Sequence, residues 1–189
     1  ISRREFYSRE FKVSPNVLIP RQETECVVDT AIELIKSHDS IQTVLDLCTG
    51  CGCIAISLAL ETNAKVVGSD ISAPAIEIAR HNGESLSADV EWLESDGFTE
   101  IVGRKFDLIV SNPPYLKRVE IFMPEVAKFE PEIALYAGTD GLDAYRWIAK
   151  EAPKCLNKAG FVLIETGWGM ADGVRKIFAE CGFEYLKAT

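Results

Sequence analysis

Residues 43–60 read TVLDLCTGCGCIAISLAL: a short apolar run, a turn with two glycines and a longer apolar run. The first run predicts a strand over residues 43–47 that is buried on both faces, as strands of parallel sheets are. The second predicts a helix over residues 53–60 that is apolar almost all round and therefore buried. Gly50 and Gly52 allow the backbone between them to pass close to a ligand. The stretch indicates an α/β protein.

The same alternation of strand and helix continues along the chain. We expect strands over residues 65–69, 90–94, 106–110 and 160–165, with a last strand beginning at 184–186. We expect helices from the Ser72 cap to Asn82-Gly83, from the Asp140 cap to Cys155, and over 172–181. Such a series predicts a doubly wound, mostly parallel Rossmann-like sheet with right-handed crossovers.

The first forty residues have a different pattern. Alternating residues predict a β-hairpin of segments 5–13 and 17–19, with its break at Ser14-Pro15-Asn16. A helix then follows residues 19–25, and its apolar stripe consists of Val27, Val28, Ala31, Leu34 and Ile35. We therefore divide the chain into an N-terminal hairpin and substrate-pocket segment, residues 1–21, and an α/β domain, residues 22–189.

Composition limits the class of protein. The chain has 189 residues and a net charge of −9, so a duplex nucleic acid is disfavoured as the main partner. No apolar run has the ~18 residues of a membrane span, and the N-terminus has no signal-peptide pattern. Six cysteines in such a chain suggest free thiols in a reducing compartment. We expect a cytoplasmic monomer without a membrane partner.

A nucleoside site is predicted where the strands end, because ligands of doubly wound folds bind outside the carboxyl ends of the strands. Asp70 ends the second strand, 20 residues after Gly50, and its carboxylate can accept hydrogen bonds from both ribose hydroxyls. The predicted cofactor-binding residues are Asp46, Cys48, Thr49, Gly50, Cys51, Gly52, Asp70, Ile71, Asp96, Gly97 and Asn112.

The glycines also fit a dinucleotide fingerprint, Gly50-x-Gly52-x-x-Ala55. Asp46, however, stands at the strand end four residues before Gly50. Its carboxylate would repel a pyrophosphate but would attract a sulfonium or an ammonium group. This favours S-adenosylmethionine (SAM) over NAD as the ligand.

Asn112-Pro113-Pro114-Tyr115 directly follows the strand over 106–110 and its neighbour Ser111. Two prolines cannot continue a sheet ladder, and they hold the preceding residue in an extended conformation. We expect the Asn112 side-chain oxygen and the Pro113 carbonyl to accept the two hydrogens of a substrate –NH2 group. The predicted catalytic residues are Asn112, Pro113, Pro114 and Tyr115, and the substrate pocket adds Arg21, Glu23 and Thr24. For Arg21 and Glu23 the alternative is a surface ion pair.

Cys48-x-x-Cys51-x-Cys53 leaves three interpretations open. The cysteines are small residues in a tight turn, a redox pair, or zinc ligands together with Cys26, Cys155 or Cys181. We favour the first and predict no metal, because a second Cys-x-x-Cys is absent from the sequence. The tryptophans are expected to pack in the core, and the histidines are given no catalytic role; these are Trp92, Trp147, Trp168, His38 and His81.

Several segments occur in an order that is typical of one family: Phe11-x-Val13, residues 17–25, 46–52 and 111–115, Phe129-Glu130-Pro131, and Gly138-x-Asp140-Gly141. Together they resemble the HemK-type (PrmC) protein-(glutamine-N5) methyltransferases, class I SAM-dependent enzymes that modify peptide chain release factors in translation termination. The resemblance implies SAM as methyl donor, S-adenosylhomocysteine as product, and the glutamine of a release-factor Gly-Gly-Gln motif as acceptor. It also implies a helical N-terminal domain, which we expect to be absent here, and a final strand that we expect to be truncated.

Other functions remain open on the sequence. One is an amino-methyltransferase that acts on another protein glutamine or on adenine. A second is an NAD-type or dithiol oxidoreductase, and a third is a nucleotide-binding scaffold without catalysis.

Overall fold

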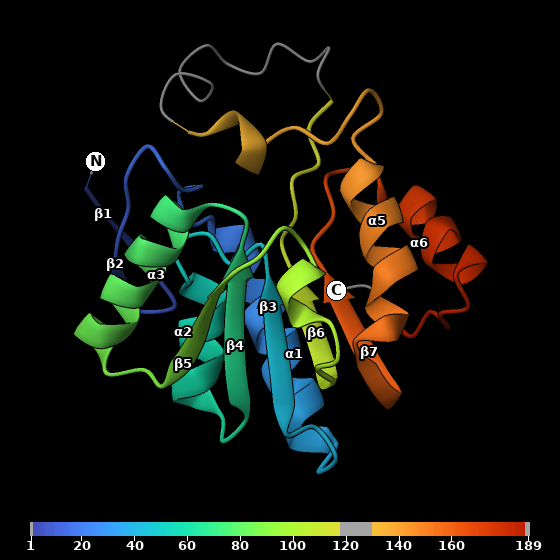
Figure 1. Cartoon of the computed structure of the whole chain (residues 1–189), viewed down its shortest axis with the longest axis horizontal. Coiled ribbons are helices and arrows are strands. Elements are labelled where there is room, and N and C mark those ends of the chain that lie inside the picture. Colours follow the sequence, from blue (N-terminus) through green and yellow to red (C-terminus); the bar gives the residue numbers. More distant parts are fainter. Residues whose placement is uncertain (1, 118–129, 188–189) are drawn as a thin grey trace.

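The computed structural model describes residues 2–117 and 130–187. Its centre is a parallel sheet with the order β5-β4-β3-β6-β7 (Figure 1). The strands are β3 (Thr43–Leu47), β4 (Lys65–Asp70), β5 (Val90–Glu94), β6 (Phe106–Ser111) and β7 (Leu156–Ile164). The chain builds outward from β3 to β5 and then returns to the other side of β3 with β6. The switch point of this doubly wound sheet is therefore between β3 and β6, where such folds bind ligands.

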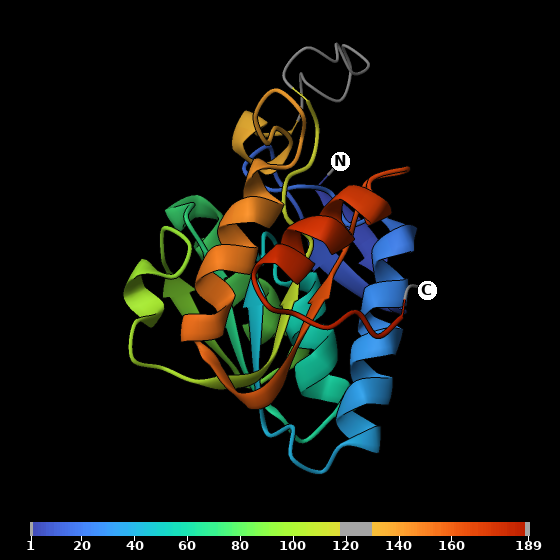
Figure 2. The ribbon, with the colours of Figure 1, turned by 90° about the vertical axis from the view of Figure 1, so that its right-hand side faces the viewer.

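Helices cover both faces of the sheet. They are α1 (Glu25–Ser37), α2 (Cys53–Glu61), α3 (Ala73–Leu86), α5 (Asp143–Glu151) and α6 (Ala171–Glu180). Seen edge-on, α1 and α5 lie on opposite sides of the sheet (Figure 2). Alternate residues of β3 accordingly enter different cores: Val44 packs with the residues of α1 and α2, and Leu45 packs with Ile148 of α5. Within residues 2–117 and 130–187, no helix has the length and apolar character needed to cross a bilayer.

The predicted α/β fold and its central elements are confirmed. Strands β3 and β5 have the predicted bounds, and β4, β6 and α2 each extend one residue beyond them. Helix α1 buries Val27, Val28 and Ala31 of the predicted stripe. These elements are local apolar runs between strong turn signals, which is why the sequence locates them.

The predicted turn of the N-terminal hairpin is wrong. The hairpin consists of β1 (Arg3–Phe6) and β2 (Arg9–Lys12), and it turns at Tyr7 and Ser8 instead of at Ser14-Pro15-Asn16. Tyr7 and Ser8 have φ values of +50° and +56°, which a two-residue turn with positive φ at both positions requires. Such turns usually contain Asn-Gly, so Tyr-Ser gave no recognisable signal.

The predicted end of the third helix is also wrong, because α3 passes through Asn82 and Gly83. The Asn82 side chain accepts a hydrogen bond from Lys12 N (2.8 Å) and donates to the carbonyls of Lys12 (3.0 Å) and Cys51 (2.9 Å). Gly83 faces the Trp92 ring, which would lie 3.2 Å from an added Cβ. Both residues serve contacts with distant segments, and the helix continues to Leu86.

Three predictions in the C-terminal third need correction. Residues 184–186 form no strand, and Tyr185 and Leu186 are exposed. Helix α5 starts at Asp143 and ends at Glu151. It starts later than predicted because Asp140 accepts a hydrogen bond from Leu142 N in the preceding turn and does not cap the helix. Trp168, expected in the core, is fully exposed. The Phe129 position of the family motif lies outside the described residues.

Trp92 of β5 packs against three glycines from different elements. A Cβ added at Gly68 of β4 would lie 2.5 Å from its ring, and one at Gly52 would lie 2.7 Å from it. At Gly83 the corresponding distance is 3.2 Å. The ring therefore fills space that only glycine leaves free.

We predict that Gly68→Ala destabilises the protein by about 1–3 kcal/mol, the usual cost of overpacking a core. Denaturant unfolding would measure this, and the cost should shrink in a Trp92→Leu background, since residues in contact are energetically coupled. Gly173→Ala in α6 is the matched control, because its Cβ would meet only Leu142 at 3.7 Å. Equal stability of Gly68→Ala and wild type would contradict the packing described.

Candidate active site

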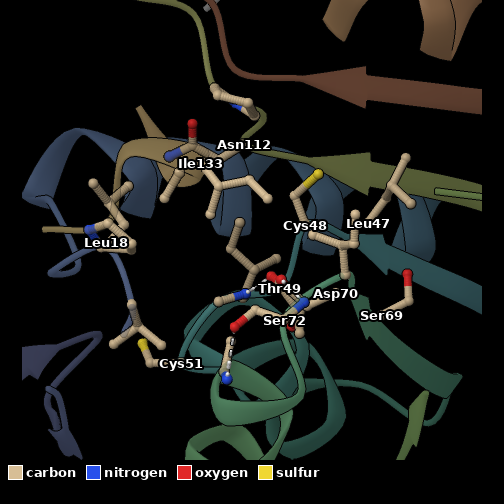
Figure 3. A pocket seen from close by; sticks show the side chains of 18 of the residues that line it. Leu18, Leu47, Cys48, Thr49, Cys51, Ser69, Asp70, Ser72, Asn112 and Ile133 are labelled. Atoms are coloured by element: carbon tan, nitrogen blue, oxygen red, sulfur yellow. Dashed lines mark hydrogen bonds between the residues drawn. The ribbon is translucent and has the colours of Figure 1, made fainter. Parts of the chain in front are cut away.

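A cavity of about 360 Å³ lies at the carboxyl ends of β3, β4 and β6 (Figure 3). Asn112 and Ile133 are on one side of it, with Thr49, Asp70 and Ser72 opposite. The predicted site residues that line it are Arg21, Thr24, Cys48, Thr49, Gly50, Cys51, Asp70, Ile71, Asp96, Gly97, Asn112 and Pro114. Those that do not line it are Glu23, Asp46, Gly52, Pro113 and Tyr115.

Asp70 holds the turn that precedes α2. Its Oδ2 accepts a hydrogen bond from Gly50 N (2.9 Å), and its Oδ1 accepts one from Ser72 N (3.0 Å). Burial raises the pKa of Asp70, and the backbone hydrogen bonds oppose this. A carboxylate has about four acceptor sites, so Asp70 can still accept a hydroxyl hydrogen from a ligand.

The turn between β3 and α2 has a backbone that favours glycine. Gly50 and Gly52 have φ values of +54° and +83°, and Cys48 also has positive φ. The Thr49 N–H donates to the carbonyl of Ser69 (2.9 Å), which fixes the turn to β4. This conformation brings main-chain atoms of the turn to the cavity wall.

Asp46 lies behind this turn and is fully buried. Its Oδ2 accepts hydrogen bonds from the Thr49 hydroxyl (2.5 Å) and from Ala55 N (3.0 Å), while its Oδ1 has no partner. Burial raises the pKa of Asp46 to about 7. The residue therefore connects β3, the turn and the start of α2, and its predicted attraction to a cationic ligand would act through Thr49.

Two thiols at the turn that precedes α2, those of Cys48 and Cys53, have raised pKa values and are therefore unreactive. Burial raises the pKa of Cys48 to about 12, and the pKa of Cys53 is also raised, chiefly by the neighbouring thiol of Cys51. A redox pair needs the opposite shift, since the thiolate is the reactive form. All six cysteines are free thiols. In the described part of the chain, no group of three or more His, Cys, Asp or Glu side chains could hold a metal ion.

Asn112 follows β6 and has one unsatisfied group. Its Nδ2 donates to Thr24 Oγ1 (3.1 Å), while its Oδ1 is buried and has no hydrogen-bond partner. An unpaired buried acceptor costs about 1–3 kcal/mol, so such an atom is a strong indication of a functional site. Tyr115 packs against Gly167, where an added Cβ would lie 2.8 Å from its ring.

Arg21 pairs with a residue that the sequence analysis did not include in the site. Its Nη2 lies 2.9 Å and 2.8 Å from the two carboxylate oxygens of Glu130, which is almost fully buried. Glu130 also accepts a hydrogen bond from Ile19 N (3.3 Å). This pair contradicts the alternative that Arg21 forms a surface ion pair with Glu23. The Phe-Glu-Pro motif was the available signal for Glu130.

The cavity is also lined by apolar residues that the sequence pattern did not indicate, including Leu18, Ile133 and Trp147. Trp147 packs as expected, with its ring centroid 5.2 Å from that of Phe98, and it also lines the cavity beside Gly97. An added Cβ at Gly97 would lie 1.8 Å from the Trp147 ring. Gly97 is therefore required by this close approach.

Comparisons with known proteins agree with this geometry. Residues 26–129 match the model of the methyltransferase small domain family. The chain is 42% identical to the release factor glutamine methyltransferase of Geobacter sulfurreducens, over 95% of this chain and 63% of that one. It is 43% identical to that of Neisseria gonorrhoeae, over 95% of this chain and 66% of that one. These matches confirm the resemblance, and the chain spans slightly less than two thirds of each relative.

A solved structure extends the comparison to the fold. A methyltransferase from Pyrococcus furiosus superposes with a TM-score of 0.66 at 18% identity, over 94% of this chain and 80% of that one. At this identity the likeness concerns the fold alone. It confirms the predicted Rossmann-like arrangement.

We predict that Asp46 makes the free energy of unfolding fall as pH rises from about 4 to about 7. Burial raises its pKa to about 7 from 3.8, so the folded state binds the proton more tightly than the unfolded chain. Asp46→Asn should remove this contribution, which is on the order of a few kcal/mol over the whole range. Denaturant unfolding of the ligand-free protein at several pH values would measure it.

Asp107→Asn is the control for this measurement. Although burial alone would raise the pKa of Asp107, hydrogen bonds from Gln42, Asn157 and Thr43 lower it. The stability that Asp107 contributes is lost as pH falls below about 5, so its replacement should leave the slope between about pH 5 and pH 7 unchanged. Equal slopes for wild type and Asp46→Asn would contradict the assignment.

Proposed function

Since the chain belongs to the methyltransferase small domain family, we propose that it transfers a methyl group from SAM to the side-chain amide nitrogen (N5) of the glutamine in the Gly-Gly-Gln motif of peptide chain release factors. Two relatives of more than 40% identity carry the name release factor glutamine methyltransferase. The observation that carries the proposal is the unpartnered Oδ1 of Asn112, a fixed acceptor at the end of β6. Release factors are the proposed partners.

The residues around the cavity fit SAM. Asp70, held by Gly50 N and Ser72 N, would accept the ribose hydroxyls. Asp96 and Gly97 would lie beside the adenine, next to the Trp147 ring. SAM supplies a methyl group that is activated by its bond to a sulfonium. The turn of residues 48–52 would face the rest of the donor with its main chain, and Asp46 would hold this turn from behind through Thr49.

Asn112 and Pro113 would orient the acceptor. An amide nitrogen is a poor nucleophile, because its lone pair is delocalised into the carbonyl. If Asn112 Oδ1 and the Pro113 carbonyl accept the two amide hydrogens, the nitrogen lone pair would be turned towards the methyl donor. The bond from the methyl group to sulfur would break as the bond to nitrogen forms, and the methylated nitrogen would then lose one of its two hydrogens to water as a proton. Such positioning contributes roughly 7–11 kcal/mol, and fixed acceptors stabilise the positive charge that develops on nitrogen.

The N-terminal segment would complete the substrate pocket. Leu18, Pro20 and Arg21 line the cavity, and Thr24 holds the Asn112 amide. The Arg21–Glu130 pair ties this segment to the residues that precede Ile133. The division of the chain into residues 1–21 and 22–189 therefore stays a proposal. Glu23 and Tyr115 are proposed as further residues of the substrate pocket.

The proposal is tested by mass spectrometry of a release-factor fragment that contains Gly-Gly-Gln. SAM-dependent gain of one methylene mass on the glutamine supports it, and a fragment with Gly-Gly-Glu is the control. Methylation of an adenine-containing oligonucleotide instead of the fragment would favour the alternative acceptor, which the net charge of −9 disfavours.

We predict that the protein binds S-adenosylhomocysteine far more tightly than NAD. Asp70→Ala should weaken the binding by ~1.5–3 kcal/mol, the range for lost hydrogen bonds to a charged group. Calorimetry with each ligand measures both quantities. Asp70→Asn tests the charge without removing the side chain, and the exposed Asp89→Ala is the control. Tighter binding of NAD would refute the donor assignment.

We predict that Asn112→Ala slows methyl transfer by about a hundred- to a thousandfold, the usual cost of losing one preorganised electrostatic partner. Asn112→Asp should fall between wild type and Ala, since it keeps acceptors but loses the N–H that bonds Thr24. The chemical step should suffer more than substrate binding, because the contact matters most as nitrogen becomes cationic.

Single-turnover methylation of the Gly-Gly-Gln fragment measures this rate. Asn157→Ala is the matched control, because its amide bonds Asp107 near the amino-terminal end of β7. A rate for Asn112→Ala within about threefold of wild type would reduce Asn112 to a turn former.

A further inference from the structure

Glu165 directly follows β7, and its backbone is fixed beside the Asn112 turn. Its N–H donates to the carbonyl of Ser111 (2.9 Å), the residue that precedes Asn112. Its own carbonyl accepts a hydrogen bond from the Tyr145 hydroxyl (3.1 Å). These two bonds fix the Glu165 backbone beside the residue that precedes Asn112.

The carboxyl group of Glu165 lies with the side chains of Thr24 and Asn112. Hydrogen bonding from both stabilises its charged form. Its Oε2 is buried and has no hydrogen-bond partner. The buried Oε2 of Glu165 and the unpaired Oδ1 of Asn112 thus belong to residues that directly follow two neighbouring strands, β7 and β6.

The Asn112 amide has two possible orientations, related by a flip. In the observed one, Nδ2 faces Thr24 and Oδ1 is left unpaired for a substrate. In the flipped orientation, the Asn112 NH2 group would face the NH2 group of the substrate amide. Both groups are hydrogen-bond donors, so no hydrogen bond could form between them. Thr24 cannot choose between the two, because a hydroxyl both donates and accepts. A carboxylate only accepts, so it favours Nδ2 on its side and repels Oδ1.

We propose that Glu165 is a positioning residue that keeps the Asn112 amide in the orientation that presents Oδ1 to the substrate. This role rests on the proposed methyl transfer to an amide nitrogen. Glu165 acts through Asn112 and Thr24 and touches neither substrate nor donor.

The charge of Glu165 is the property that this role needs. Burial raises its pKa, and the nearby Glu23 raises it further, while Thr24 and Asn112 oppose the shift. Among the described residues, the hydroxyls of Tyr115 and Tyr145 also interact with its charge. As pH falls through the raised pKa, Glu165 gains a proton and can donate to Oδ1, so the flipped amide becomes accessible. The rate of methyl transfer should then fall on the acid side.

The first test compares Glu165→Gln with wild type in single-turnover methylation over a range of pH. We expect the rate of methyl transfer to fall roughly 10–100-fold, the range found when residues that orient metal-binding side chains are replaced. Affinities for S-adenosylhomocysteine and for the Gly-Gly-Gln fragment should stay close to those of wild type, and the acid limb of the pH profile should disappear. Glu165→Asp should recover part of the rate, and the exposed Glu184→Gln is the control. An unchanged rate with a retained acid limb would overturn the proposal.

The second test needs neither turnover nor a Glu165 variant. The side-chain NH2 resonances of Asn112, assigned by their absence in Asn112→Asp, should shift in wild type as Glu165 titrates. Resonances that stay constant through the acid limb would overturn the proposal. If they shift but wild type methylates no glutamine, the proposed function fails while the contact between Glu165 and Asn112 stands.

Discussion

The parallel pairing of β3 with both β4 and β6 places the functional groups of this protein together. Leu47 of β3 pairs with Ser69 on one side and with Ser111 on the other. The residues that follow these positions therefore leave the sheet at the same edge, and they include Asp70 and Asn112. Three segments that are far apart in the chain enter one cavity because their strands end at the same level. The helices on both faces bury the sheet and leave this edge open.

Unsatisfied polar groups gather at that edge. Among the described residues, the buried side-chain atoms without a partner are Asp46 Oδ1, Ser69 Oγ, Asn112 Oδ1 and Glu165 Oε2. All four residues lie in or directly after strands, at their carboxyl ends. Each such group costs stability, which the well-packed cores on both faces of the sheet offset. The cost is understandable if ligands supply the missing partners, because a site that binds polar molecules needs acceptors whose hydrogen bonds are not already made.

Two kinds of contact hold the Asn112 side of the cavity, the proposed acceptor side. Glu130 binds Arg21 and the backbone of Ile19, which connects segments more than a hundred residues apart. The Asn112 side chain donates a hydrogen bond to Thr24, and both residues oppose the rise that burial causes in the pKa of Glu165. The Asp70 side, the proposed donor side, depends on shorter-range contacts, in which Asp70 and Asp46 fix the turn after β3. The donor side is therefore built by one strand–turn–helix unit and its neighbour, whereas the acceptor side requires the whole chain.

The sequence by itself determined the strand–turn–helix unit of residues 43–61, the strands β4 to β6 and the position of Asn112 at a strand end. Apolar periodicity, glycine and proline act within a few residues, so the signal is local. Only the tertiary structure decided that Asn82 and Gly83 lie inside a helix, that Arg21 pairs with Glu130, and that Glu165 lies beside Asn112. These facts follow from contacts between distant segments, and spacing along the chain carries no information about them.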